Sequence, residues 1–421
     1  MNRRKYLYTL AGALGVGSAV TANASLGRSG QRQADTTGEA RATASGRFHH
    51  EVIDDQPPVQ QRLTVVQPTD LTGNGRPDVI VGGQAEPYPG RSYVQDAVEE
   101  GVPAADTVES HLFWYENPGW ERHRMAFAPY LERGTLGDVD GDGRLDLVAG
   151  QMIHHNKVFW FRQPEDPREE WERTLITDDF EKHHNVGVAD VDDDGESELV
   201  LTSQESQVVA YYDIPEDPTV SPWPEANRHM LLEGETVQGL AVADIDGDGA
   251  TEIVVGPNVF HQPDTEGGDW ERERIVTGWD LTKVAVADLD GDGEMEVVLS
   301  ECDSPTYGTH PGRVAYFDPP DWEPTVLHEG MYNPHTLQVA DFDGDGNDDI
   351  YVAEMGLGEN PDPHHFIYFG DGSGGFERTE LATNVPTHCA KAVDMDGDGR
   401  PDIVGKPWEP RTTVDVWYNR L

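Results

Sequence analysis

The sequence predicts an all-β protein, a seven-bladed β-propeller with one hairpin loop of special composition in each blade, and three observations lead to this prediction. A nine-residue loop with oxygen-bearing side chains at positions one, three, five and nine recurs, starting at residues 70, 138, 190, 244, 288, 341 and 394. Four of the six spacings are 52 to 54 residues. Each loop also lies between two short apolar runs, which are typical of paired strands. Such a period predicts repeated units that bury their faces on each other.

The chemistry of the loop indicates a bound calcium ion, and its clearest copy is Asp288-Leu-Asp-Gly-Asp-Gly-Glu-Met-Glu296. A hard divalent cation takes six to eight oxygens, which alternate side chains of a tight loop supply, and glycine permits the sharp turn. Position twelve is apolar, as at Ala149 and Leu299, where an EF-hand carries its glutamate. We therefore expect up to seven structural calcium ions, each closing a β-hairpin.

The expected ligands are Asp70, Asn74 and Asp78; Asp138, Asp140, Asp142 and Asp146; Asp190, Asp192, Asp194 and Glu198; Asp244, Asp246, Asp248 and Glu252; Asp288, Asp290, Asp292 and Glu296; Asp341, Asp343, Asp345 and Asp349; and Asp394, Asp396, Asp398 and Asp402. The first copy is weakened, with Thr72 at its third position, and whether it binds calcium stays open.

This motif and its setting resemble the FG-GAP or VCBS repeats of the integrin α-chain type of β-propeller. The resemblance covers nearly all of the chain after residue 46. It implies the propeller fold and calcium binding, but it does not imply one activity, because one fold hosts many functions.

Four strands are expected in each repeat. The first enters the loop, the second leaves it, and the third carries aromatic residues, as in residues 112–115 and 158–161. The fourth strands begin at Trp120, Trp171, Trp270, Trp322 and Phe376. Aromatic and β-branched strands of this kind fill the interfaces between blades.

The ends of the chain predict how the ring closes. Only two strands follow the seventh loop, at residues 401–405 and 413–418, so the last blade lacks its outer strand. Residues 47–53 resemble a fourth strand with no blade before it. We expect this segment to complete the seventh blade and remove an open edge. An insertion at residues 84–110 is expected to form a long loop over one face.

The charge balance limits the partners. The chain has 30 Lys and Arg against 79 Asp and Glu, a net charge of -49. A field so negative disfavours nucleic acid and anionic membranes, and it suits a protein of a salt-loving organism, where salt screens self-repulsion. The alternative is an ordinary acidic secreted protein.

The N-terminus predicts export. Asn2-Arg-Arg-Lys-Tyr-Leu7, a modest apolar stretch to Val20 and Ala22-Asn-Ala24 are typical of a twin-arginine signal peptide, too short and too polar to span a membrane. We expect a signal peptide at 1–24, a disordered linker at 25–46 and the propeller at 47–421, secreted as a monomer without membrane insertion.

Because strand direction alternates within a blade, one face should carry the calcium hairpins and the other a polar funnel around the axis. Six residues before each loop stand Thr64, Glu132, His184, Gln238, Thr282, His335 and His388. Just after the second strands stand Gln84, Gln151, Glu205, Glu301, Glu354 and Lys406, with Lys283 and Lys391 near them. His154, His155, His261, His310, His364 and His365 are expected in loops at the same mouth.

Two functions remain open from these patterns. One is a binding or adhesion module at the cell surface, with carbohydrate or a surface protein as partner. The other is a carbohydrate-active enzyme whose candidate catalytic residues are His184, His335, His388, Lys391, Glu301 and Glu354, because imidazole and amine remove protons while carboxylates orient hydroxyls or hold a metal. The alternative for these groups is that propeller axes are polar and their histidines satisfy backbone groups.

A second resemblance bears on the enzyme. Residues 114–120, Trp-Tyr-Glu-Asn-Pro-Gly-Trp, and 335–341, His-Thr-Leu-Gln-Val-Ala-Asp, are similar to the propeller part of aldos-2-ulose dehydratase-type enzymes, and some polysaccharide lyases also use calcium-bearing propellers. This similarity implies sugar β-elimination or dehydration, with His184, His335 or His388 as base. An additional transition metal in the funnel is a further expectation. Cys302 and Cys389 could pair, stay free or help to bind such a soft metal.

Overall fold

The computed structural model describes residues 47–57, 62–84, 112–126, 131–151, 155–263, 268–279, 281–303, 311–356, 360, 362–407 and 413–421, without the side chains of Arg62, Gln84, Lys406 and Pro407. The expected signal peptide, linker and nearly all of the insertion at 84–110 lie outside these residues and remain predictions.

The described residues form seven four-stranded antiparallel sheets, here called blades 1 to 7. Blade 1 contains β2 (Arg62–Thr69), β3 (Asp78–Gln84), β4 (Leu112–Glu116) and β5 (Glu121–Ala126). Blade 2 contains β6 (Leu131–Gly137), β7 (Asp146–Gln151), β8 (Val158–Arg162) and β9 (Glu172–Thr177). Blade 3 contains β10 (His183–Ala189), β11 (Glu198–Ser203), β12 (Val208–Asp213) and β13 (Arg228–Glu233). Blade 4 contains β14 (Ala241–Ala243), β15 (Glu252–Val255), β16 (Asn258–His261) and β17 (Glu271–Arg274).

Blade 5 contains β18 (Lys283–Ala287), β19 (Glu296–Ser300), β20 (Gly312–Asp318) and β21 (Glu323–Met331). Blade 6 contains β22 (Pro334–Ala340), β23 (Asp349–Glu354), β24 (His364–Gly370) and β25 (Phe376–Thr383). Blade 7 contains β26 (Thr387–Val393), β27 (Asp402–Pro407), β28 (Val414–Asn419) and β1 (Phe48–Asp54). A 3-10 turn at Glu225–Asn227 is the helical element of the described chain, and none of its helices is long and apolar enough to cross a membrane.

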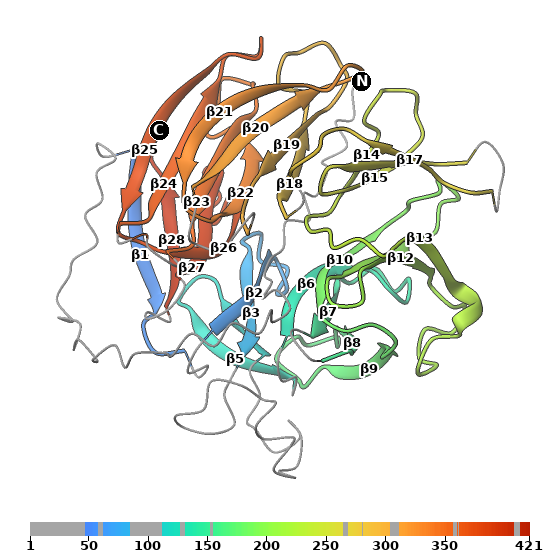
Figure 1. Cartoon of the computed structure of the whole chain (residues 1–421). Coiled ribbons are helices and arrows are strands. Elements are labelled where there is room, and N and C mark those ends of the chain that lie inside the picture. The colour runs from blue at the N-terminus through green and yellow to red at the C-terminus, as the bar shows by residue number, and fades with distance from the viewer. Residues whose placement is uncertain are drawn as a thin grey trace, which may run out of the picture.

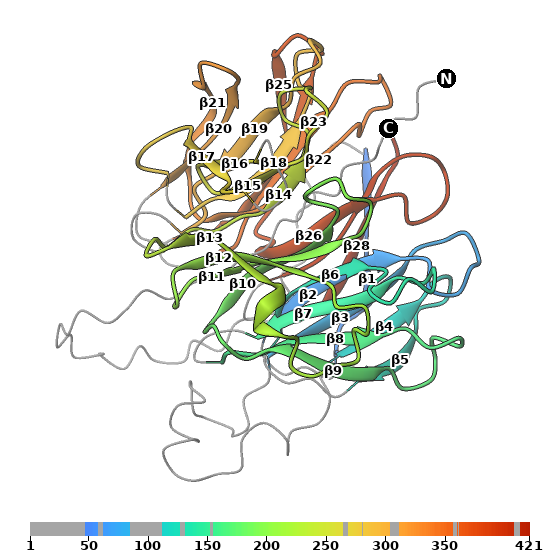
Figure 2. The ribbon, with the colours of Figure 1, turned by 90° about the vertical axis from the view of Figure 1, so that its right-hand side faces the viewer.

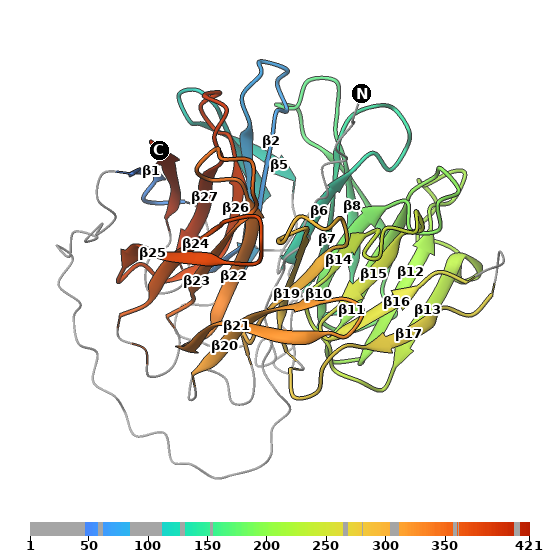
Figure 3. The ribbon, with the colours of Figure 1, turned by 90° about the horizontal axis from the view of Figure 1, so that it is seen from above.

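The blades stand in a ring, as the sequence predicts (Figure 1). The first strand of each blade is innermost: β2 contacts β6 and β26, β6 contacts β10, and β18 contacts β14 and β22. Figures 2 and 3 give the same ring from two further directions, and in Figure 3 the outer strands β13, β17 and β25 lie toward the periphery. Since every first-to-second hairpin has the same direction, all seven special loops leave the ring on one face.

The core is divided into layers between blades. Each of seven clusters of buried apolar side chains joins two consecutive blades, and one of them joins blade 7 to blade 1. Between blades 1 and 2, the indole N–H groups of Trp114 and Trp171 both donate to the carbonyl of Pro167, at 3.2 and 3.1 Å. The aromatic residues predicted to fill these interfaces therefore do so, and at Trp114 and Trp171 the polar edge of the indole is bonded as well.

The strand expected at residues 47–53 is present as β1. It pairs antiparallel with β28, Phe48 opposite Asn419 and Val52 opposite Asp415. Phe48 is buried and meets Phe342 of blade 6 edge to face, with the ring centroids 6.5 Å apart. The two ends of the described chain thus share one sheet.

Candidate cation loops and axial polar cluster

The position-nine carboxylate performs the same task in all seven loops. It begins the second strand and accepts the backbone N–H of position two. The pairs are Leu71–Asp78 at 3.0 Å, Val139–Asp146 at 3.2 Å, Val191–Glu198 at 2.8 Å, Ile245–Glu252 at 2.8 Å, Leu289–Glu296 at 2.5 Å, Phe342–Asp349 at 2.7 Å and Met395–Asp402 at 2.8 Å. These carboxylates are at most 3% exposed, so the bond closes each hairpin from inside the fold.

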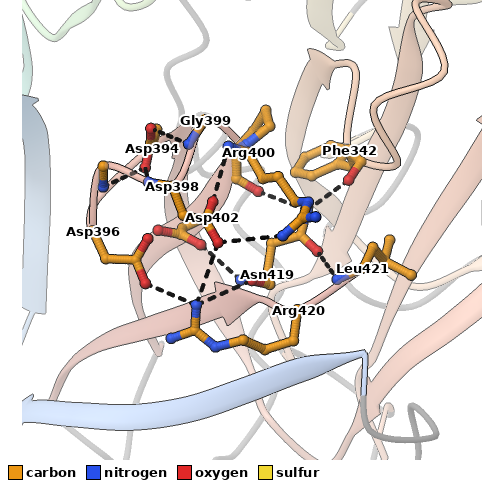
Figure 4. A network of polar contacts seen from close by, with 12 residues as sticks. Phe342, Asp394, Asp396, Asp398, Gly399, Arg400, Asp402, Asn419, Arg420 and Leu421 are labelled. Carbon is orange, nitrogen blue, oxygen red and sulfur yellow. Dashed lines mark hydrogen bonds and ion pairs between the residues drawn. The ribbon is translucent and has the colours of Figure 1, made fainter.

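The carboxylate at position one of the loop accepts backbone N–H groups of the loop itself, as Figure 4 shows for Asp394 of the seventh loop. Asp394 accepts the N–H groups of Gly397 at 2.7 Å, Asp398 at 3.1 Å and Gly399 at 2.8 Å. Gly397 and Gly399 have φ of 79° and 90°, a conformation that side chains disfavour. The loop sequence thus folds into a ring of inward-facing oxygens.

These oxygens converge as a hard cation requires. In the loops of blades 2 to 5, one ligand atom from each of three acidic side chains lies within 4.8 Å of the others, as with Asp288, Asp290 and Glu296. One oxygen each of Asp190, Asp244 and Glu296 is buried and accepts no hydrogen bond from the described residues. An all-oxygen set with free buried lone pairs fits calcium.

The burial of the position-nine carboxyls among other loop carboxylates raises their pKa values. Burial, followed by smaller effects that include neighbouring carboxylates, raises the pKa of Glu198 to about 8. Burial likewise raises the pKa of Glu252, Glu296 and Asp349 to about 7 and that of Asp78, Asp146 and Asp402 to about 6. Ionising these buried carboxyls therefore costs free energy in each loop, and a bound cation would remove that cost.

The seven loops are not equivalent. In the second loop Arg162 pairs with Asp140 at 2.5 Å, and in the seventh Arg420 pairs with Asp396 at 2.7 Å (Figure 4). The first loop has neutral Thr72 and Asn74 in place of carboxylates, and the Asn74 amide donates to the carbonyl of Asn117 at 2.7 Å. Guanidinium groups and missing charge both weaken the attraction for a cation.

Five loops are bonded to the following blade through the carbonyl of position two. The donors are Gln262 to Val191 at 2.9 Å, Met295 to Ile245 at 2.7 Å, Gly374 to Leu289 at 3.2 Å, Asn419 to Phe342 at 2.6 Å and Asn117 to Met395 at 2.8 Å. The last bond joins blade 7 to blade 1. The hairpins of blades 3 to 7 are consequently joined in a run that ends at blade 1, and order in one of these loops supports the next blade.

On the axis, the residues expected to line a polar funnel form a buried cluster. Thr64, Glu132, His184, Gln238, Thr282, His335 and His388 are at most 1% exposed. His335 stacks on His388 with centroids 4.8 Å apart, and its Nδ1 lies 3.0 Å from the carbonyl oxygen of His388. The polar side chains expected around the axis are therefore buried against one another, and they fill the centre of the ring.

A β-bulge places five of these seven side chains. The pairing of first and second strands skips one residue in blades 1, 2, 3, 6 and 7, and the skipped residues are Thr64, Glu132, His184, His335 and His388. A bulged residue leaves the ladder, and its side chain is re-aimed. The repeated bulge explains why residues that stand six positions before each loop come together on the axis.

The axial cluster also contains cationic groups. Burial lowers the pKa of His184 well below its usual value, and the charges of Lys182, Lys283 and Arg133 lower it further. Burial likewise lowers the pKa of Lys182 and Lys283 to about 8 and that of Lys391 below its usual range. Because these groups come from blades 2, 3, 5 and 7, their mutual interaction places them on the axis.

Two members of this cluster escaped sequence reasoning. Arg133 donates from Nη1 to the Cys389 sulfur at 2.8 Å, and Lys182 is 1% exposed. Both are direct or near neighbours of predicted positions, Glu132 and His184. Strand alternation would send Arg133 and its neighbour Glu132 to opposite faces, and the bulge between Leu131 and Arg133 brings them together.

Glu301 and Glu354 lie apart from the cluster contacts. Both oxygens of Glu301 accept bonds from Arg313, at 2.7 Å from Nε and 2.8 Å from Nη2. Glu354 accepts the backbone N–H groups of Tyr332 at 2.6 Å and His364 at 2.8 Å. At the ends of second strands, Glu301 thus holds the third strand of its own blade, and Glu354 holds the segment between blades 5 and 6 and the start of β24.

The histidines expected in loops at the mouth of the funnel lie in different places. His261 ends β16 and its Nδ1 lies 3.7 Å from the Glu252 oxygen, so its expected place at the face away from the cation loops is wrong. His365 lies between blades 6 and 7, bonded to Tyr351 at 3.0 Å and to the Val385 carbonyl at 2.6 Å, beside a small cavity lined also by Asp415. His154 and His310 lie outside the described residues.

Cys302 and Cys389 are buried free thiols, so neither forms a disulfide. Burial is the main reason why the pKa of the Cys302 thiol is raised.

Comparison with known proteins agrees with the geometry of the blades. Residues 138–201, 190–255 and 341–405 match the family model of the FG-GAP-like repeat. Each matched segment begins at the first aspartate of a cation loop. No curated protein matches the chain.

Proposed function

Because the chain is a seven-bladed β-propeller with FG-GAP-like repeats, we propose that it is an exported, calcium-loaded binding module that acts at the cell surface. The observation that supports this function best is the set of seven acidic hairpins on one face, five of which are bonded to the following blade. A rigid face loses little conformational entropy when a partner binds.

Calcium would give this face its binding chemistry. Positions one, three and five of the loops are exposed or half-buried, as with Asp288, Asp290 and Asp292. Calcium takes up to eight oxygens, so an ion in such a loop can share its outer positions with oxygens of a partner. Sugar hydroxyls and the carboxylates of a surface protein both offer such oxygens.

Binding to immobilised polysaccharides and to cell-surface protein extracts, with calcium and after chelation, tests this function. We expect saturable, calcium-dependent binding that Asp290→Asn and Asp343→Asn weaken. Asp217→Asn is the matched control, because Asp217 is an exposed loop aspartate bonded to Thr219 and outside every cation loop. Binding unchanged by chelation, or no binding to either panel, would contradict the proposal.

A carbohydrate lyase or dehydratase is the second candidate. It is favoured by His184 beside Lys182 and Lys283, two amines whose pKa of about 8 suits proton transfer near neutral pH. Because all three side chains are buried, this function requires the axial cluster to open to its substrate. Unsaturated sugar products, detected by their ultraviolet absorbance during incubation with a panel of polysaccharides, would support it. Loss of the product signal in His184→Gln, with folding retained, would assign the base. Without product from any substrate class, the candidate fails.

A further inference from the structure

We propose that Cys302, Asp303 and His335 form a buried site for one zinc-like transition-metal ion, separate from the calcium loops. One ligand atom from each side chain lies within 4.8 Å of the other two. The three residues are 0%, 4% and 1% exposed. The spacing suits three donors around one small ion, since zinc–ligand bonds of about 2.0 to 2.3 Å put neighbouring donors less than 5 Å apart.

The fold fixes these three residues from two blades. Cys302 and Asp303 follow β19 of blade 5, while His335 is the bulged residue of β22 in blade 6. The side-chain amide of Asn333 donates to the Cys302 carbonyl at 2.6 Å, and the Asp303 N–H donates to the Leu281 carbonyl at 3.3 Å. The ligand-bearing backbone is therefore positioned without a metal.

The groups around the ligands have the orientation that a metal site needs. When His335 Nδ1 donates its proton to the His388 carbonyl, 3.0 Å away, Nε2 becomes the lone-pair nitrogen. Histidine ligands of metals usually make this second bond. The Gln238 amide donates to the Cys302 sulfur at 2.9 Å, which stabilises a thiolate.

Gln238 supplies an independent observation that points to a ligand. Its side chain is 0% exposed, and its Oε1 accepts no hydrogen bond from the described residues. A buried amide oxygen without a partner is costly. Because the nitrogen of the same amide contacts Cys302 at 2.9 Å, this oxygen lies close to the proposed site.

The donor set decides the metal. Thiolate, imidazole and carboxylate together suit zinc and similar divalent transition ions, whereas calcium takes oxygen ligands. A divalent ion also balances the two negative charges of an ionised Cys302 and Asp303. The neighbouring ammonium of Lys283, which interacts with both, is the competing counter-ion, and the experiment separates the two.

Metal content measured by mass spectrometry in excess calcium tests the proposal. Excess calcium fills the oxygen loops, so we expect one equivalent of zinc to remain, and cobalt(II) in its place to give a thiolate-to-metal charge-transfer band. Cys302→Ser and His335→Gln should lose that equivalent and the band. Cys389→Ser, the other buried free cysteine, is the matched control and should keep both.

A positioning residue extends the test. Gln238→Met removes the N–H donor to sulfur and should weaken metal affinity by about 10- to 100-fold while leaving the band position. The cobalt titration of the unaltered protein does not depend on any variant folding. If that protein binds no cobalt in excess calcium, binds it without the sulfur band, or if Cys302→Ser retains the ion, Lys283 is the counter-ion and the proposal is overturned.

Discussion

The choice between Asp and Glu at position nine changes what the carboxylate can do. Where it is Asp, the second oxygen accepts an N–H at the end of the third strand or just past it: Asn117 to Asp78 at 2.8 Å, Gln163 to Asp146 at 2.7 Å, Gly370 to Asp349 at 2.9 Å and Asn419 to Asp402 at 2.6 Å. No such bond is described for Glu198, Glu252 or Glu296. The longer side chain reaches further into the loop, so the Glu loops of blades 3 to 5 have one more oxygen for a cation.

The raised pKa values of these carboxyls predict an unusual pH dependence. The pKa of Glu198 is about 8 and that of Asp349 about 7 in the folded chain, against ordinary values near 4. The folded state therefore binds more protons between about pH 4 and pH 8, so its stability falls as the pH rises through this window. The upper limit is about 1.4 kcal/mol for each pKa unit of each group.

Thermal unfolding of the chelated protein in concentrated salt should thus give a higher Tm at pH 5 than at pH 8. Saturating calcium should remove this slope, because the ion replaces the protons. Glu198→Gln should make the slope shallower in the chelated protein. An equal or higher Tm at pH 8 without calcium would contradict the raised pKa values of these carboxyls.

Arg420 competes with a cation for Asp396, whose Oδ2 lies 2.7 Å from its guanidinium. Arg420→Gln should raise calcium occupancy of the seventh loop by about two- to five-fold at limiting calcium, as expected for a partly exposed ion pair. Counting retained ions by native mass spectrometry measures this. Arg124→Gln, which removes an exposed pair with Glu170 away from the loops, should leave the count unchanged, and an unchanged count in both variants would contradict the competition.

At the scale of elements, two devices repeat from blade to blade. The bulge in the first strand turns one side chain toward the axis, and the position-two carbonyl of the loop bonds the next blade. The carbonyl of Ile245, for example, accepts the N–H of Met295 in the following loop at 2.7 Å. The first and second strands of a blade therefore have the bulge near one end and the acidic loop at the other, and both ends contact other blades.

The outer strand of blade 7 is a third element with a distinct role. β1 covers the edge of β28, and an uncovered edge strand invites pairing with another chain. A chain starting at residue 56 should unfold several degrees lower and should self-associate. A chain starting at residue 47 is the matched control and should match the full chain. Calorimetry and light scattering measure the two effects, and equal behaviour of both truncations would contradict this role.

At the scale of the whole molecule, net charge opposes folding. A charge of -49 repels itself in the compact state, and salt screens that repulsion over a Debye length of about 10 Å at 0.1 M and about 3 Å at 1 M. The chelated protein should therefore gain Tm steadily with potassium chloride. Potassium is used because it is a poor ligand for calcium cages, and a flat or falling Tm between 0.1 M and 1 M would contradict the prediction of a salt-adapted protein.

Much of the architecture could be predicted because it is local and repeated. Loop spacing, strand alternation and the aromatic third strands give the blades, and an unmatched strand at each end of the chain indicates their pairing in β1 and β28. The cation loops follow from spacing alone, since a nine-residue turn brings its own side chains together. His184, His335 and His388 were also placed on the axis by a constant offset from the loops.

The sequence by itself determined which residues stand in each loop and each strand, because these relations span fewer than about ten residues. Only the tertiary structure decided which distant groups meet. The bulges pack Arg133 against Cys389 at 2.8 Å and His335 against His388, and they bury the polar groups of the axis. Contacts between blades depend on ring closure and register, and neither is encoded in the pattern of a single repeat.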